Sequence, residues 1–229
     1  MHRIRGNLDS VRQRIARAAE AAGRDPGEIT LVAVTKTYPA ETINEGIEAG
    51  ITIIGENRVQ EAAGKYPRIG QRAQWHLVGH LQSNKAKKAV EIFSLIHSID
   101  SVKLAQEVGR RAAERGKVQG VLLEVNTSGE AQKQGVEPDR TLEVLGEAGE
   151  IKGIRVMGLM TVGPLTGEVT KIRKAFEKLR TIFEEAGGLG LANVEMRHLS
   201  MGMSGDFELA IAEGSNMVRI GTAIFGSRA

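Results

Sequence analysis

The sequence contains no cysteine, and aromatic residues make up only 3% of its 229 positions. The absence of cysteine excludes disulfides, thiolate metal sites and a cysteine nucleophile, and it fits a reducing compartment. The scarcity of aromatic side chains argues against a nucleic-acid-binding protein, because such proteins commonly stack bases on aromatic rings. A net charge of +3 permits the binding of small anions without indicating nucleic acid.

Long apolar runs are absent as well. The N-terminal stretch "MHRIRGNLDSVRQRIARAAEAAG" lacks the apolar core of a signal peptide, and no later segment approaches the length of a membrane span. We therefore expect a soluble cytoplasmic protein that does not bind the membrane. A hydrophobic content of 41% is sufficient for a core, and we predict a single domain over residues 1–229.

Short apolar runs alternate with amphipathic stretches along the chain. Residues 2–22 place apolar side chains at alternating spacings of four and three, which predicts a helix. Eight predicted strands follow, separated by helical patterns, at residues 31–35, 51–54, 75–79, 95–99, 120–125, 154–160, 194–199 and 217–220. This alternation predicts a parallel sheet, and the continuous apolar runs suit strands buried on both faces.

Eight strand–helix units in a chain of this length predict an α/β fold, a single (β/α)8 TIM barrel, with a doubly wound open sheet as the alternative. Only "GTAIFGSRA" follows the eighth strand, so we expect neither a full eighth helix nor a C-terminal β-domain. The N-terminal helix has no strand before it. We expect this extra helix to cover the gap that the missing eighth helix leaves.

Polar residues follow the seventh and eighth strands. Barrels of this kind carry function where strands end, and many bind phosphate with the loops after strands 7 and 8. Here those loops contain Ser200, Gly221 and Thr222. Glycine lets backbone N–H groups approach an anion closely, and hydroxyl groups add donors. The pattern therefore predicts a phosphate site, with small residues in tight turns as the alternative interpretation.

Lys36 ends the first strand, which a barrel places beside the eighth. Two roles follow from that position: a cation for the phosphate, or an amine that forms a Schiff base with a phosphorylated carbonyl compound. The alternative is a lysine that extends from the barrel mouth into water. Arg219, within the eighth strand, is expected to point into the mouth, where a buried arginine needs an acceptor.

Other polar segments give weaker indications of a functional site. His76 and His80 are four residues apart, but they straddle a strand end and no carboxylate has a matching spacing, so we predict no metal site. The segment "EVNTSGEAQKQG" at residues 124–135 is interpreted as a solvated loop. No P-loop or G-x-S-x-G motif is present.

The segment "VAVTKTYP" around Lys36 resembles the lysine segment of the pyridoxal phosphate (PLP) homeostasis proteins. Five further blocks are similar to that family in the same order: "GENRVQE", "WHLVGHLQSNK", "LMT", "LSMGMSGDFELAI" and "VRIGTAIFG". The resemblance covers nearly the whole chain, and its motifs are specific when taken together. That family in turn resembles the barrel domain of alanine racemase and the fold-type III decarboxylases.

The resemblance implies six residues that bind PLP, namely Lys36, Asn57, Ser200, Arg219, Gly221 and Thr222. Lys36 would form the Schiff base, the residues at 200, 221 and 222 would hold the phosphate, and Arg219 would face the pyridine nitrogen. Asn57 would lie at the ring face or the 3′-oxygen. His80 would line the mouth.

The resemblance also implies PLP homeostasis, that is, binding, buffering and delivery to apo-enzymes without marked turnover and without catalytic residues. An arginine opposite the ring nitrogen makes the cofactor a poorer electron sink, which agrees with a protein that binds PLP without marked turnover. The alternative is a weak PLP enzyme such as an amino-acid racemase, which needs a second acid–base group; Tyr38, near Lys36, is the candidate. A PLP-free barrel with an aldolase-type lysine is a third hypothesis. We expect a monomer.

Overall fold

Eight parallel strands close into a barrel in which each strand pairs with the next one in the sequence and β8 pairs with β1. The structure is a computed structural model and describes residues 2–130 and 133–226. The strands are β1 (Thr30–Val34), β2 (Ile53–Glu56), β3 (Gln74–Leu77), β4 (Leu95–Ile99), β5 (Gln119–Glu124), β6 (Ile154–Met160), β7 (Val194–Ser200) and β8 (Met217–Ile220). The predicted TIM barrel is confirmed, and the open-sheet alternative is wrong.

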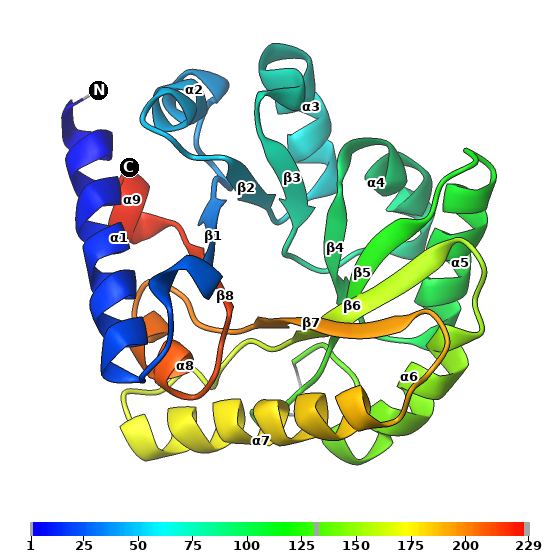
Figure 1. The fold of residues 1–229 in the computed structure, drawn as a ribbon. Helices are drawn as coiled ribbons and strands as arrows, with labels where there is room; N and C mark the ends of the chain where they lie inside the picture. The colour runs from blue at the N-terminus through cyan, green and yellow to red at the C-terminus, as the bar shows by residue number, and fades with distance from the viewer. Residues whose placement is uncertain (1, 131–132, 227–229) are drawn as a thin grey trace.

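Helices lie around the strands (Figure 1). They are α1 (His2–Ala21), α2 (Ala40–Glu48), α3 (Val59–Ile69), α4 (Ala86–Ile92), α5 (Val102–Ala113), α6 (Thr141–Gly149), α7 (Val169–Gly188), α8 (Phe207–Ala212) and α9 (Thr222–Phe225). Short 3-10 turns occur at Pro26–Glu28, Gly70–Arg72, Ser83–Lys85 and Pro138–Arg140. Every named strand in the described part of the chain belongs to the barrel.

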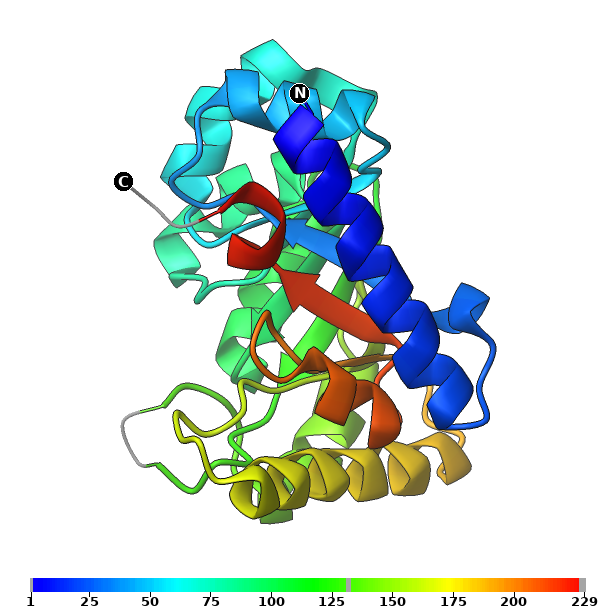
Figure 2. The ribbon, with the colours of Figure 1, turned by 90° about the vertical axis from the view of Figure 1, so that its left-hand side faces the viewer.

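The eighth barrel helix is short, as predicted. Helix α9 has four residues, and α1 packs against both α9 and α8. Figure 2 shows α1 crossing the outer side of the barrel beside β8, α9 and α8. Leu8 and Val11 of α1 are almost completely buried there. The N-terminal helix therefore covers the part of the barrel that a full eighth helix would cover.

The predicted strands agree with the observed ones except near β2 and β3. The prediction of 51–54 is two residues early, because β2 continues through Gly55 and Glu56. These two residues therefore lie inside the strand, and Asn57 is the first residue after it. The cause is the burial of Glu56, a charged residue that pairs with Lys65 of α3 and that the apolar pattern alone does not place in a strand.

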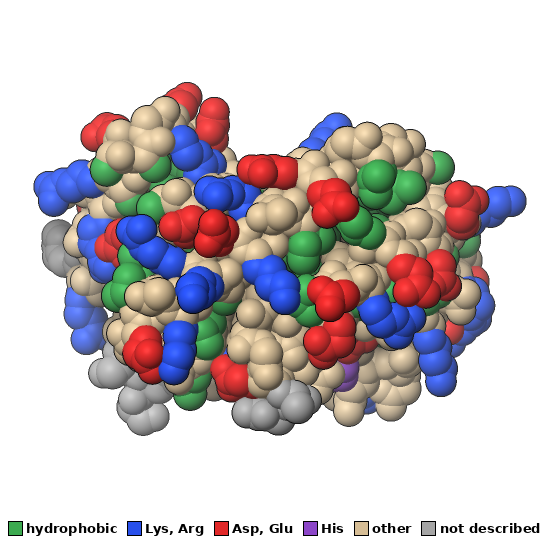
Figure 3. Space-filling view, turned by 90° about the horizontal axis from the view of Figure 1, so that it is seen from below, with side chains coloured by type: hydrophobic (Ala, Val, Ile, Leu, Met, Phe, Trp, Pro, Cys, Tyr) green, Lys and Arg blue, Asp and Glu red, His purple; other side chains and the backbone are tan. Residues whose placement is uncertain are grey.

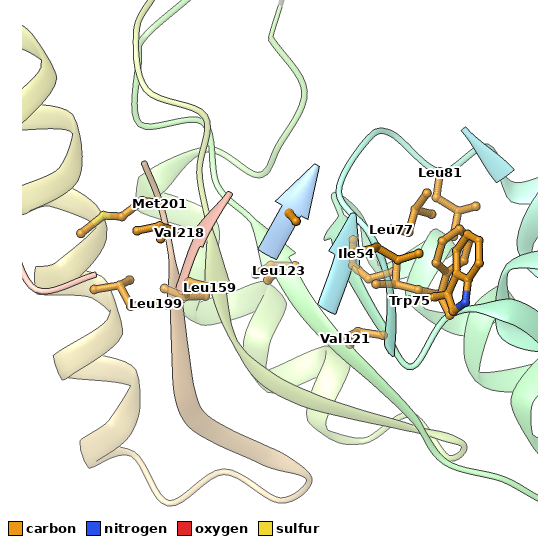
Figure 4. Close-up of a cluster of buried hydrophobic side chains, with 14 of the residues drawn as sticks. Ile54, Trp75, Leu77, Leu81, Val121, Leu123, Leu159, Leu199, Met201 and Val218 are labelled. Atoms are coloured by element: carbon orange, nitrogen blue, oxygen red, sulfur yellow. The ribbon is translucent and has the colours of Figure 1, made fainter. Parts of the chain in front are cut away.

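Successive residues along each strand point alternately to two cores. The outer core fills the space between strands and helices, and Figure 4 shows part of it, with Ile54, Leu123, Leu159 and Val218 among its members. A smaller cluster joins apolar side chains from five strands inside the barrel: Val32, Leu95, Leu122, Met160 and Met217. Since Met217 points inward, Arg219 two residues later does so as well.

Charges of both signs are interspersed on the face that α7 covers (Figure 3). On this helix Lys171 pairs with Glu168 at 2.6 Å, and Arg180 lies 3.7 Å from Glu213. Such mixing is typical of a solvent-exposed face. No helix in the described ranges combines the length and the apolar character that crossing a membrane requires.

Candidate functional site

The ends of β1 and β8 lie side by side, which brings Lys36 to the loop after β8. Val32 pairs with Arg219 and Ala33 with Ile220, so the register carries Gly221 next to Val34. A Cβ atom built on Gly221 would lie 3.1 Å from the Val34 carbonyl oxygen, so the two strand ends approach each other closely. Lys36 follows two residues after Val34 and is half-buried in a turn. The predicted neighbourhood of Lys36 and Gly221 is therefore present.

Arg219 is the buried cation of the barrel mouth. Its Nη1 donates to Ser200 Oγ at 2.7 Å, and its Nη2 donates to the Thr161 carbonyl at 2.7 Å. Burial lowers the pKa of Arg219 to about 10, while the nearby carboxylates of Glu124 and Asp206 favour its charged form. The guanidinium is therefore charged near neutral pH, and its acceptors are a hydroxyl and a carbonyl rather than a salt-bridged carboxylate.

Ser200 lies at the end of β7, as predicted, but its side chain points into the barrel. Its hydroxyl accepts from Arg219 and contacts His97 Nδ1 at 3.2 Å, and His97 Nε2 lies 3.0 Å from His76 Nδ1. Burial lowers the pKa of His76 to about 3 and that of His97 well below its usual value. Both rings are therefore neutral, and Ser200 links Arg219 to a buried chain of two imidazoles.

A second serine, Ser204, contacts the loop after β8, where the sequence analysis placed the phosphate. Its Oγ accepts from the backbone N–H groups of Gly221 and Ala223, each at 3.4 Å. Thr222 lies between those two amides and is exposed. The loop after β8 thus brings two backbone amides to the Ser204 hydroxyl, and the exposed Thr222 lies between these amides in the chain, a set of groups suited to a phosphate. The signal in the sequence was the "MSGD" segment, but its spacing did not say which serine faces the loop.

Asn57 is held at the mouth by the close approach of the next loop. A Cβ atom on Gly79 would lie 2.5 Å from the Asn57 carbonyl oxygen, so only glycine lets the ends of β2 and β3 approach this closely. Asn57 and Gly79 share a cavity of about 310 Å³ with His80, Glu124 and other residues from the ends of β5 and β6. The predicted residues Asn57 and His80 therefore both line the mouth, as do buried groups that the sequence analysis missed.

Glu124 is the most perturbed of these missed groups. It ends β5, is 8% exposed, and has its pKa raised to about 7 by burial. The charge of Arg219 partly opposes this increase, whereas that of Asp100 adds to it. Nothing in the sequence marked this residue, because the apolar run before it predicts only a strand end.

The loop after β5 closes over one side of the mouth. Lys133 donates to the Gly163 carbonyl at 2.9 Å and pairs with Glu130 at 2.8 Å. Its side chain lines the cavity that contains Glu124. The predicted solvated loop at 124–135 therefore begins with buried residues, Glu124 to Thr127, and positions 131 and 132 lie outside the described residues.

The alanine racemase N-terminal domain family matches residues 6–229 of this chain. A pyridoxal phosphate homeostasis protein of Aquifex aeolicus is 43% identical over 222 residues, which cover 96% of each chain. That of Escherichia coli K12 is 40% identical over 233 residues, covering 100% of this chain and 98% of its own. The chain belongs to the pyridoxal phosphate homeostasis protein family.

A solved structure with substantial sequence identity has the same fold. PipY of Synechococcus elongatus PCC7942, in the structure with PLP bound, superimposes with a TM-score of 0.84 at 35% sequence identity. The match covers 97% of this chain and 100% of that one. Within the described residues of this chain, no group of three or more histidine, aspartate or glutamate side chains is arranged to hold a metal ion.

Proposed function

We propose that this protein binds pyridoxal 5′-phosphate through a Schiff base on Lys36 and takes part in intracellular PLP homeostasis as a carrier and buffer. The observation that carries the proposal is the position of Lys36 beside the donor set formed by Ser204, Gly221 and Ala223. An amine next to a phosphate-binding donor set is what a phosphorylated aldehyde requires. The full-length similarity to PLP homeostasis proteins and to PLP-bound PipY supports it.

The residues of the mouth fit the cofactor. We assign the phosphate to Ser204, Thr222 and the amides of Gly221 and Ala223, and the ring nitrogen to Arg219. Asn57 lies toward the ring, and Ser200 supports Arg219 from inside the barrel. When bound, PLP supplies an aldehyde that condenses with a primary amine and releases water.

A carrier role without marked turnover fits the contacts of the two tyrosines and of Arg219. The hydroxyl of Tyr38 donates to the Gly226 carbonyl at 2.6 Å, and its ring packs against Phe225 at 4.9 Å. Tyr66 packs against Trp75 at 5.5 Å, between α3 and β3. Both tyrosines are thus engaged in other contacts, so neither is placed to act as the second base that the racemase hypothesis requires. A charged Arg219 opposite the ring nitrogen weakens electron withdrawal by the cofactor.

The cellular setting belongs to the same proposal. We expect a cytoplasmic monomer that exchanges PLP with apo-enzymes and needs neither nucleic acid nor membrane. The cysteine-free composition supports a reducing compartment. Size-exclusion chromatography with light scattering tests the monomer, and activation of a PLP-dependent apo-enzyme by the loaded protein tests delivery.

The decisive experiment is an absorbance spectrum of the PLP-loaded protein before and after borohydride, followed by peptide mapping. We expect a near-visible band that reduction fixes onto Lys36, and we expect Lys36→Ala to lack it. A protein that takes up no PLP contradicts the proposal. Incubation of the loaded protein with L-alanine, followed by chiral analysis, tests the enzyme alternative; substantial D-alanine would show that the carrier role is incomplete.

A further inference from the structure

The turn that carries Lys36 is held from behind by a buried cluster of charged side chains. The Tyr38 amide donates to the Thr35 carbonyl at 3.1 Å, which closes a four-residue turn around Lys36. Thr37, the third residue of the turn, has a φ of 69°. That region favours glycine and is unfavourable for a β-branched residue. The turn therefore adopts a strained conformation that its surroundings must maintain.

Lys65 of α3 fixes the peptide group before Lys36. Its ammonium donates to the Thr35 carbonyl at 2.8 Å, to Glu56 Oε1 at 2.7 Å and to Glu61 Oε1 at 2.7 Å. The three N–H donors of the ammonium are therefore all used. Glu56 also accepts from the Thr35 hydroxyl at 2.6 Å, which fixes the same residue a second time.

Glu61 fixes the peptide group after Lys36. The oxygen that accepts from Lys65 also accepts from the Thr37 amide, at 2.5 Å. This donor set lowers the pKa of Glu61, so the side chain is a carboxylate near neutral pH, whereas burial raises the pKa of Glu56. One lysine and two glutamates thus hold the carbonyl on one side of Lys36 and the amide on the other.

Stability alone does not account for this cluster. Glu56 is completely buried, and its Oε2 has no hydrogen-bond partner among the described residues. Buried ion pairs commonly contribute less than well-packed apolar residues of the same volume, and an unpaired buried oxygen adds a further cost. What the cluster provides instead of stability is two contacts with the backbone on either side of Lys36, at the Thr35 carbonyl and the Thr37 amide.

We propose that Glu56, Glu61 and Lys65 form a positioning cluster that holds the Lys36 turn in its strained conformation and so sets the amine for reaction with an aldehyde. Thr35 faces outward to the cluster, and the chain turns at Lys36 toward the mouth. The inference rests on the proposed role of Lys36. It adds that the geometry of the turn, rather than the charge of the cluster, determines how fast the amine reacts.

The test compares Glu61→Ala with Glu61→Gln. Both remove the same charge, but glutamine keeps an oxygen that accepts from the Thr37 amide and from Lys65. Glu61 is partly exposed, so neither variant leaves a buried charge unpaired, as a change at Lys65 would. Two quantities are measured: hydrogen exchange of the Thr37 amide without PLP, and the second-order rate of borohydride-trappable adduct formation with PLP.

We expect Glu61→Ala to accelerate Thr37 amide exchange and to slow adduct formation, each by roughly tenfold. Glu61→Gln should remain within about twofold of the unmodified protein in both, because conservative substitution rescues the hydrogen bonds. Equal slowing in both variants would assign the effect to charge and overturn the proposal, as would no slowing in Glu61→Ala. If the unmodified protein forms no adduct on Lys36, the proposed function fails, and unchanged Thr37 exchange in Glu61→Ala refutes the cluster separately.

Discussion

Two serines four residues apart have different tasks at the barrel mouth. Ser200 is buried and accepts from Arg219, whereas Ser204 is half-buried and accepts from two backbone amides after β8. A hydroxyl that accepts from a buried cation is expected to contribute mainly to folding, whereas the Ser204 hydroxyl lies in the proposed phosphate site and is expected to contribute mainly to PLP binding. The two residues can therefore be separated by experiment.

We predict that Ser200→Ala lowers the free energy of unfolding by about 1–3 kcal/mol, because Arg219 Nη1 and His97 lose their buried partner. Ser204→Ala should change that free energy by less than about 0.5 kcal/mol and weaken PLP binding roughly tenfold. Urea unfolding of the apo-protein and fluorescence titration with PLP measure the two quantities. The opposite pattern would return the phosphate to Ser200.

Glu124 makes stability depend on pH. Its pKa rises from 4.5 to about 7 on folding, so between these values the native state holds a proton that the unfolded state has released. Stability therefore falls as pH rises through this range. We predict that Glu124→Gln, which cannot ionise, gains about 3 kcal/mol relative to the unmodified protein between about pH 4 and about pH 8.

Urea unfolding at a series of pH values checks this prediction, with the difference between variant and unmodified protein as the measured quantity. Other titrating groups cancel in that difference. A difference that does not change with pH would mean that Glu124 ionises as readily in the folded protein as in the unfolded chain.

At the scale of elements, the site depends on how closely neighbouring strands approach at their ends. The ends of β2 and β3 meet at Asn57 and Gly79, where the glycine leaves no room for a side chain. The ends of β1 and β8 also approach closely at Val34 and Gly221, although less tightly. Backbone packing at the strand ends thus restricts where the loops that carry Asn57 and Lys36 can lie.

We predict that Gly79→Ala destabilises the protein by about 1–3 kcal/mol, because the new Cβ would lie 2.5 Å from the Asn57 carbonyl oxygen. It should also weaken PLP binding by displacing Asn57. Gly64→Ala is the matched control: it lies within α3, where a Cβ has no atom within 4 Å, and should stabilise by about 0.5–1 kcal/mol. Thermal unfolding measures the stability of both variants. Equal effects of the two substitutions would show that the backbone at Gly79 leaves room for a methyl group.

At the scale of the whole molecule, the described strands form a closed barrel, so each of them pairs with a neighbour on both sides. Strand β1, near the N-terminus, pairs with β8, near the C-terminus, and α1 packs on α8 and α9. We therefore propose that residues 1–229 form one cooperative domain. The positions of the site residues therefore depend on the whole barrel being folded.

We predict that Trp75 fluorescence and far-UV circular dichroism report the same urea midpoint. Trp75 is 2% exposed on β3 and reports one side of the barrel, whereas circular dichroism averages over all helices and strands. Coincident transitions indicate a single unit. Two separated midpoints would show that part of the barrel unfolds independently and would contradict the single domain.

The sequence alone determined the order and approximate bounds of the elements, the closed barrel, and the position of Lys36 at the end of β1. These follow from local periodicity, since alternation of short apolar runs and amphipathic helices leaves few topologies. The family motifs added the cofactor and six candidate residues. Strand β2 was misplaced because a buried glutamate does not appear in an apolar pattern.

Only the tertiary structure decided which side chains meet. Arg219 contacts Thr161, 58 residues earlier, and Lys65 reaches the Thr35 carbonyl, 30 residues earlier. The different partners of Ser200 and Ser204, the raised pKa of Glu124 and the cluster behind Lys36 all arise from such distant contacts. The burial and the hydrogen-bond partners of a side chain depend on where the closed barrel places it. The spacing of residues along the sequence does not predict these contacts.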